Sequence, residues 1–210
     1  MKLIKPGYEI LTPLDGLTEL KAIERAARTC YKSEAAITDD GESAKKLVRR
    51  LIDSGHEAML EHSFLSVKFT VDRGVTHELV RHRLCSFAQE STRYCNYSGE
   101  KFEKSVKFII PYFFKDNLEA MNAWTYACAK AEEAYFELLE LGATPQEART
   151  VLPNSTAAEI VMSGNYREWR HILKLRTAKD AHPQMREVMR PLGEELKRRI
   201  PIIFDNCVTE

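Results

Sequence analysis

The sequence predicts a mixed α/β (α+β) fold, with more helix than strand, in one domain that covers residues 1–210 and packs long helices around a central sheet. Three observations predict it. The 210 residues contain no internal repeat, low-complexity tract or Ser/Gly-rich linker at which a domain would end. Hydrophobic residues make up 44% and charged residues 30%, which is ordinary for a globular protein. Segments with the apolar alternation of strands lie among longer segments with the apolar period of helices.

The first part of the chain is expected to form two helices and then a strand. Residues 18–30 and 42–54 each place apolar side chains on one helical face, and Gly55 ends the second segment. Residues 63–71 alternate in the manner of a strand with one buried face. The stretch Asp72-Arg73-Gly74 is expected to end that strand.

Residues 75–87 predict a further helix, with Arg81, His82 and Arg83 in its middle. Apolar residues are interleaved with these charged ones, which indicates that the helix is partly buried. Buried arginines need anionic partners. The two nearby carboxylates, Glu78 and Glu90, are too few for the three arginines of residues 81–93. A bound phosphate would satisfy them, because a guanidinium group matches phosphate oxygens. The alternative is a solvated surface, which is the usual place of a charge cluster.

The second half of the chain is expected to be mainly helical. The expected elements are a strand at 104–110, helices at 117–141 and 144–152, a strand at 156–162, and helices at 166–178 and 183–200. Thr144-Pro145 has the cap and first-turn proline of a helix start. Pro191 is expected to kink or break the last helix, because proline lacks the backbone donor.

Composition and charge exclude several classes of protein. The formal net charge is zero, which argues against a general nucleic-acid binder. No apolar run approaches the ~20 residues that would span a membrane. The N-terminus lacks the features of a signal peptide, and the five scattered cysteines suggest reduced thiols. We therefore expect a cytoplasmic protein with no membrane and no nucleic-acid partner.

The most specific pattern is Arg81-His82-Arg83, followed after seven residues by Ser91-Thr92-Arg93-Tyr94. In this pattern the chain resembles the flavin-dependent thymidylate synthases, from about residue 55 to about Arg176. The resemblance implies the fold of that family and the reductive methylation of dUMP to dTMP. It also implies FAD as cofactor, NADPH as its reductant, 5,10-methylenetetrahydrofolate as carbon donor and tetrahydrofolate as product. The implied assembly is a homotetramer with active sites shared between subunits.

The resemblance implies a role for individual residues. The implied FAD contacts are Ala58, Arg81, His82, Arg83, Gln89, Asn165, Arg167 and His171. The implied dUMP contacts are Glu78, Arg81, Gln89, Glu90, Ser91, Thr92, Arg93, Arg149 and Arg176. His56 is expected near the folate and flavin rings. Glu78 occupies a position where the family can have Gln, and His171 one where it can have Asn. Ala58 occupies a position where some relatives have a hydroxyl group, so only the backbone of Ala58 can contact FAD.

Arg176 is the expected catalytic residue, because an arginine at the uracil ring stabilises the negative charge that develops there. Ser91 has no obvious general base and is assigned to binding rather than to nucleophilic attack. No enzyme nucleophile and no metal are expected.

Other interpretations of these residues remain open. Asn165 could serve only as a helix N-cap, and Arg176 could simply complement a helix dipole. His56 and His62 superficially suggest zinc, but they are six residues apart rather than four. The rival functions are a nucleotide-binding or RNA-binding module built on the basic segment, and a metal hydrolase. The hydrolase would use His56, His62, His77 or His82.

Overall fold

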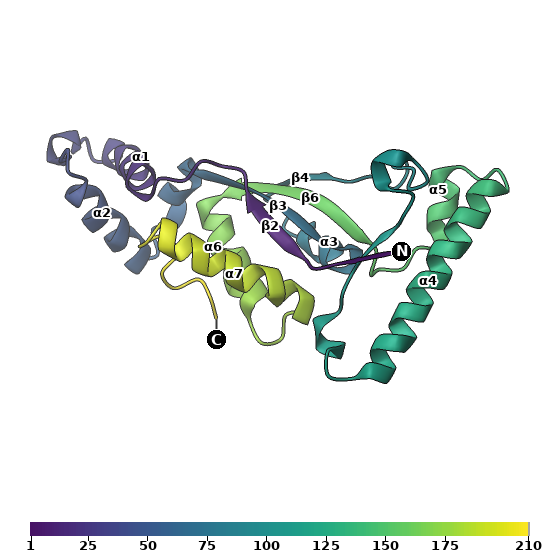
Figure 1. Ribbon diagram of the computed structural model, residues 1–210. Coiled ribbons are helices and arrows are strands. Elements are labelled where there is room, and N and C mark those ends of the chain that lie inside the picture. Colours follow the sequence, from purple (N-terminus) through teal and green to yellow (C-terminus); the bar gives the residue numbers. More distant parts are fainter. Residues whose placement is uncertain (210) are drawn as a thin grey trace. The chain divides into compact units, whose positions relative to one another are not determined.

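The computed structural model describes residues 1–209, which form seven α-helices and six β-strands (Figure 1). The helices are α1 (Gly16–Thr29), α2 (Glu42–Asp53), α3 (Arg73–Leu79), α4 (Leu118–Glu140), α5 (Pro145–Ala148), α6 (Tyr166–Thr177) and α7 (Pro183–Arg199). The strands are β1 (Lys2–Ile4), β2 (Gly7–Ile10), β3 (Phe64–Asp72), β4 (Ser86–Gln89), β5 (Lys107–Ile109) and β6 (Ala157–Asn165). The predicted mixed α/β class is confirmed. No helix within residues 1–209 is both long and apolar enough to cross a membrane.

The strands form two sheets. A four-stranded sheet has the order β2-β3-β6-β4, and β1 pairs with β5 in parallel, with Leu3 opposite Phe108. In β3 the alternate residues Leu65, Val67, Phe69 and Val71 are buried, as the two-residue pattern of this segment predicts. β1 and β2 were not expected from the sequence, because each is too short for its pattern to stand out.

By internal contacts the chain divides into two compact units, and boundaries between them fall within β2, β3, β4 and β6. The first unit contains Met1–Gly7, Phe69–Arg81 and Phe87–Val161. The second contains Tyr8–Lys68, His82–Ser86 and the chain from Met162 onward. The prediction of a single domain over residues 1–210 stays a prediction.

The first unit has a core of aromatic and small residues around α4. Its buried members are Tyr97, Val106, Phe108, Cys128, Tyr135 and Ala148. Asn117 caps α4, since its Oδ1 accepts a hydrogen bond of 3.0 Å from Ala120 N. Only Cys128 and Tyr135 are buried among the 23 residues of α4, and Leu118 and Tyr126 are 73% and 67% exposed. These two large apolar side chains of the helix are therefore uncovered in the single chain.

The second unit is built around α6 and α7. Trp169 of α6 is fully buried, and its Nε1 donates a hydrogen bond of 3.0 Å to Leu65 O of β3. α7 continues through Pro191, so the possible break at this residue does not occur. Its buried face includes Val188 before the proline and Leu192 after it, and this packing holds the helix on both sides of the missing donor.

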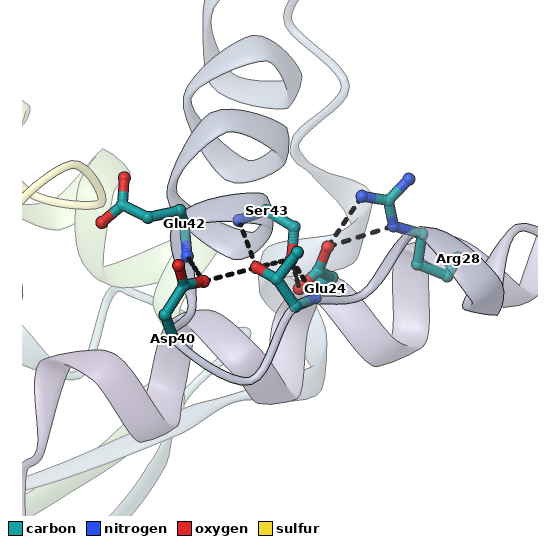
Figure 2. Close-up of polar contacts among 6 residues, drawn as sticks. Glu24, Arg28, Asp40, Glu42 and Ser43 are labelled. Carbon is teal, nitrogen blue, oxygen red and sulfur yellow. Dashed lines mark hydrogen bonds and ion pairs between the residues drawn. The ribbon is translucent and has the colours of Figure 1, made fainter.

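A buried carboxylate joins α1 to α2 in the second unit (Figure 2). Glu24 is fully buried, and its Oε1 accepts hydrogen bonds from Arg28 Nη2 at 2.8 Å and Nε at 3.1 Å. Its Oε2 accepts one from Ser43 Oγ at 2.9 Å. Beside them, Asp40 Oδ1 accepts hydrogen bonds from Glu42 N and Thr38 Oγ1 (Figure 2). Because a buried charge is costly unless it is paired, this network specifies how the two helices meet.

Three other predicted elements differ in extent. The strand expected at 104–110 shortens to β5, because Glu103 and Lys104 have positive φ angles of 56° and 50°. The helix expected at 144–152 is α-helical only to Ala148 and continues as the 3₁₀ segment Arg149–Val151. β6 extends three residues beyond the expected end at 162 and reaches Asn165, directly before α6.

Candidate functional site

The motif Arg81-His82-Arg83 lies in the turn between α3 and β4, not inside a helix. α3 is capped by Asp72, whose Oδ1 accepts a hydrogen bond of 2.9 Å from Val75 N, and the helix ends at Leu79. The predicted helix 75–87 is therefore wrong beyond residue 79. Its last part forms β4 instead, because those residues pair with β6, a strand far away in the sequence.

Burial within this turn also differs from the expectation. His82 is buried, at 5% exposure, whereas Arg81 and Arg83 are exposed. Within residues 1–209 neither arginine side chain has a hydrogen-bond or ion-pair partner. Leu84, one of the apolar residues interleaved with these charges, is 76% exposed. The prediction of partly buried arginines is wrong, and both guanidinium groups face solvent, where an anionic ligand can reach them.

Three side chains of the second unit surround the motif histidine: Glu168, His171 and Arg176. Together with His82 we call them the His82 cluster. Arg176 Nε donates a hydrogen bond of 3.0 Å to His82 Nε2, and Glu168 Oε1 lies 3.4 Å from His82 Nδ1. The rings of His82 and His171 meet edge to face at 6.1 Å. Burial, the Arg176 charge and His171 lower the pKa of His82 from 6.5 to about 4. The imidazole is therefore neutral at physiological pH.

Within residues 1–209, His82, Glu168 and His171 offer ligand atoms within 4.8 Å of one another. These are residue types that bind zinc. Arg176 opposes this use, because its Nε–H already occupies His82 Nε2. A metal on His82 Nδ1 would require the proton on Nε2, where two donors would face each other. The geometry favours a hydrogen-bonded cluster, and the expectation of no metal stays a prediction.

A cavity of about 570 Å³ lies beside this cluster in the second unit. Its lining residues are Glu57, Glu61, Leu84, Asn165, Arg167, Glu168, Arg170, His171 and Lys174. Three expected FAD contacts, Asn165, Arg167 and His171, thus share one cavity. Arg167 and His171 lie on one face of α6, as their spacing of four residues predicts. Their role toward a cofactor stays a prediction.

Local structure explains how these side chains are placed. Asn165 ends β6 and caps α6, because its Oδ1 accepts a hydrogen bond of 2.9 Å from Glu168 N. Arg167 Nη1 donates a hydrogen bond of 2.6 Å to Glu61 Oε1. Arg170, only 3% exposed, pairs with Glu57 at 3.0 Å. The Asn165 cap is therefore real, and it leaves the amide nitrogen of the side chain for another contact.

Sequence reasoning missed several residues of this cavity. Lys174 lies three residues after His171 and seven after Arg167, so the helical period could have identified it as a member of the same face. Glu57 and Glu61 come from the 3₁₀ segment Glu57–His62, and no local pattern connects them to α6.

A second group, which we call the Arg149 cluster, lies in the first unit and consists of Arg73, His77, Thr92 and Arg149. These residues line a cavity of about 340 Å³ together with Thr150, Leu152, Pro153 and Asn154, and no carboxylate contributes to this lining. Arg149 Nη1 donates a hydrogen bond of 3.1 Å to Thr92 Oγ1. Arg73 Nη1 is buried and has no hydrogen-bond partner within residues 1–209. The cluster is a cationic site with an unsatisfied donor, suited to an anion.

Two of these residues were predicted to contact dUMP, and two were missed. Thr92 and Arg149 are 57 residues apart in the sequence, and the fold brings them together. Arg149 directly follows the short helix α5, which begins with a capping box between Thr144 and Glu147. The Thr144-Pro145 pair predicted the start of this helix. Arg73 and His77 are four residues apart on α3, a spacing that places them on one face.

The other predicted residues of the motif loop are held by the first unit itself. Gln89 Nε2 donates a hydrogen bond of 3.0 Å to Thr76 Oγ1. Glu90 Oε1 accepts one of 2.9 Å from Tyr97 OH, and Oε2 accepts one from Glu159 N. The Arg93 guanidinium lies 5.3 Å from the centre of the exposed Tyr94 ring. Both carboxylate oxygens of Glu90 therefore already have partners within the loop and β6.

His56 and Ala58 do not line the 570 Å³ cavity. Both are exposed, and His56 instead lines a separate cavity of about 320 Å³ with Arg28 and Arg50. Their predicted proximity to flavin and folate gains no support from the second unit alone. Glu78 and Arg81, two further predicted nucleotide contacts, lie near the end of α3, with Glu78 half-buried and Arg81 exposed, and the predicted contact Ser91 is half-buried.

Comparison with known proteins gives consistent matches over nearly the whole chain. The family model described as "Thymidylate synthase complementing protein" matches residues 15–202. The flavin-dependent thymidylate synthase of Mycobacterium tuberculosis is 32% identical over 218 aligned residues, covering 96% of this chain and 84% of that protein. The enzyme of the same name from Mycolicibacterium gilvum is 33% identical, with the same coverage.

The fold is also similar to that of a solved structure. A UMP/dUMP methylase, PolB from Streptomyces cacaoi, crystallised with 5-Br dUMP, superposes with a TM-score of 0.80 and 26% identity. The match covers 98% of this chain and 96% of that protein. The similarity therefore includes both compact units, and it supports the fold class independently of the motif.

Proposed function

The chain belongs to the family of flavin-dependent thymidylate synthases, and on that premise we propose that it converts dUMP to dTMP by reductive methylation. The observation that carries the proposal is the His82 cluster. The motif histidine is buried and holds Arg176 in place, while the motif arginines on either side are exposed and unpaired within residues 1–209.

The residues of the second unit fit a large anionic cofactor such as FAD. The 570 Å³ cavity is of the size that binds small molecules. Its lining combines the exposed apolar side chain of Leu84 with basic side chains, of which Arg167 and Arg170 are paired with Glu61 and Glu57. We propose that FAD is held by Arg81, His82, Arg83, Asn165, Arg167 and His171, with further contacts from Gln89 and the Ala58 backbone. When bound, FAD would supply the redox chemistry of methyl formation.

The Arg149 cluster fits the phosphate of a nucleotide. Arg73 and Arg149 supply guanidinium donors, and the buried Arg73 Nη1 lacks a partner within residues 1–209. We propose that Arg149 and Thr92 bind dUMP together with Glu78, Arg81, Gln89, Ser91, Arg93 and Arg176. Glu90 would act mainly by holding this loop, because both of its oxygens are already engaged.

Arg176 would provide the chemical assistance. The C5 atom of uracil is a poor nucleophile until negative charge can develop on the ring, and a guanidinium group held beside the ring stabilises that charge. Ser91 is not the nucleophile in this proposal. Its Oγ accepts a weak hydrogen bond of 3.4 Å from Arg93 N, and within residues 1–209 it has no histidine or carboxylate partner.

We further propose NADPH as the source of electrons and 5,10-methylenetetrahydrofolate as the one-carbon donor, with tetrahydrofolate as product and His56 near the folate. A homotetramer with shared active sites is supported by α4, which exposes Leu118 and Tyr126 in the single chain. A cytoplasmic location is supported by the cysteines, all five of which are free.

The proposal is tested with purified protein by FAD titration and product analysis. We expect yellow protein, about one NADPH oxidised per dTMP formed, and tetrahydrofolate without accumulation of dihydrofolate, since flavin rather than folate is the reductant. A parallel assay replaces dUMP with UMP. Folded protein that takes up no FAD, or stoichiometric dihydrofolate without need of NADPH, would contradict the mechanism. Preferred methylation of UMP would contradict the assigned substrate.

A further inference from the structure

Glu168 has no assigned role in FAD or dUMP binding, yet it is, with Glu24, one of two buried carboxylates in the described part of the second unit. It lies in the first turn of α6 at 8% exposure. Its Oε1 faces His82 Nδ1 at 3.4 Å. A buried carboxylate is retained at a cost in free energy unless it is paired, so the identity of its partner indicates its use.

The contacts of His82 determine where the imidazole carries its proton. Arg176 Nε–H can only donate, so His82 Nε2, at 3.0 Å, must accept. The single proton of the neutral ring then lies on Nδ1, the atom that faces Glu168. His82 Nε2 thus accepts from Arg176, while the proton-bearing Nδ1 lies 3.4 Å from Glu168 Oε1 on the other side of the ring.

We propose that Glu168 is a positioning residue for Arg176, acting through His82. The carboxylate selects the Nδ1–H form of the imidazole, and that form presents the lone pair to which the Arg176 guanidinium is hydrogen-bonded. The inference rests on the proposed function for one point only, that the oriented arginine acts on the uracil ring.

The burial of the His82 and Glu168 side chains is consistent with this role. The side chains of His82 and Glu168 are 4% and 10% exposed, so water competes little for the contact between them. Among residues 1–209, Glu168, Arg176 and His171 are charged or titratable groups that face the imidazole. Burial, with Arg176 and His171, lowers the pKa of His82 to about 4, so the acceptor on Nε2 persists at neutral pH. In the other tautomer or in the imidazolium, Nε2–H would oppose Arg176.

The direct test is nuclear magnetic resonance of protein labelled with 15N-histidine, with the His82 signals assigned by their loss in His82→Gln. We expect Nδ1 protonated and Nε2 unprotonated at neutral pH in the wild-type protein, and loss of this preference in Glu168→Ala. Glu61→Gln is the matched control. It removes a carboxylate from the lining of the same cavity, but its contact is Arg167, so the His82 tautomer should not change.

Kinetics provide the second readout. Glu168→Ala should lower kcat by roughly tenfold to a hundredfold, the cost of a misplaced group, with dissociation constants for FAD and dUMP changed by less than about threefold. Glu168→Gln preserves the shape and an accepting oxygen, so it should fold and retain more activity than Glu168→Ala. A purely structural residue would instead lower stability without separating kcat from binding.

The outcomes separate this inference from the proposed function. A wild-type His82 that carries its proton on Nε2, or is charged at neutral pH, overturns the inference whatever reaction the enzyme catalyses. An unchanged kcat in Glu168→Ala overturns it as well. The expected tautomer in a protein that binds FAD but forms no dTMP would support the hydrogen-bonded chain and refute the proposed function.

Discussion

Arg149 Nη1 donates a hydrogen bond of 3.1 Å to the Oγ1 of Thr92, a residue buried to 5% exposure. The contact joins the start of a 3₁₀ segment to the loop that follows β4, both within the first unit. It also orients the guanidinium group within a lining that has arginines but no carboxylates. The fold therefore already positions hydrogen-bond donors for an anion in this cavity.

We expect Arg149→Ala to weaken dUMP binding by roughly tenfold to a hundredfold, because hydrogen bonds to charged groups contribute about 1.5–3 kcal/mol. Arg93→Ala should act in the same direction if Arg93 also contacts the nucleotide. Calorimetry with dUMP measures both. Lys115→Ala is the control, since this exposed lysine pairs with Asp116 at 3.8 Å and does not line the cavity of the Arg149 cluster. Undiminished affinity in Arg149→Ala would remove the Arg149 cluster from the nucleotide site.

Arg176→Ala should lower kcat by roughly a hundredfold or more and change dUMP affinity much less, because the positive charge matters most as negative charge develops on the ring. Arg176→Lys should restore little, since an ammonium group cannot keep the Nε contact to His82 and present a planar fork at the same time. Steady-state kinetics and dUMP titration check this. A kcat equal to that of the wild type in Arg176→Ala would exclude the assignment.

The cysteines near the motif should be dispensable. Burial, followed by the charge of Glu168, raises the pKa of Cys85 to about 12, and burial also raises the pKa of Cys95. Because the thiolate is the nucleophile, both thiols are inert at neutral pH. We expect Cys85→Ser, Cys95→Ser and Ser91→Ala to keep measurable activity, and iodoacetamide to modify the exposed Cys30 first. A covalent adduct with dUMP on any of the three residues, found by mass spectrometry, would show the reverse.

His82 should make the stability of the fold sensitive to acid. Its pKa falls from 6.5 in the unfolded chain to about 4 in the folded one, so the unfolded chain binds more protons between these values. The stabilising contribution is present above the unfolded pKa and is lost as the pH falls toward the folded one. This loss amounts to about 2 kcal/mol between pH 7 and pH 5.

Urea unfolding of the wild type and of His82→Gln at both pH values measures this effect. The difference between the two proteins in the pH dependence of the unfolding free energy isolates His82 from the other titrating groups. Equal pH dependence would mean that the imidazole titrates normally in the folded protein.

Much of the fold follows from local sequence patterns. The apolar period places α1, α2, α4, α6 and α7 within one or two residues of their observed bounds, and alternation places β3. These elements are long and each buries one face, so the pattern in a single segment is sufficient to identify them. The motif from Arg81 to Tyr94 likewise identifies the family by itself, because its residues are adjacent in the chain.

Tertiary structure decided the strand pairing and the side-chain contacts that join segments far apart in the sequence. Residues 86–89 follow an apolar pattern that also suits a helix, but pairing with β6 makes them a strand and releases Arg81 and Arg83 to the surface. The contact of Glu168 with His82, and that of Arg149 with Thr92, joins segments 57 or more residues apart. Hydrogen bonds and burial of this kind depend on distances in space, and sequence spacing carries no information about them until the chain is folded.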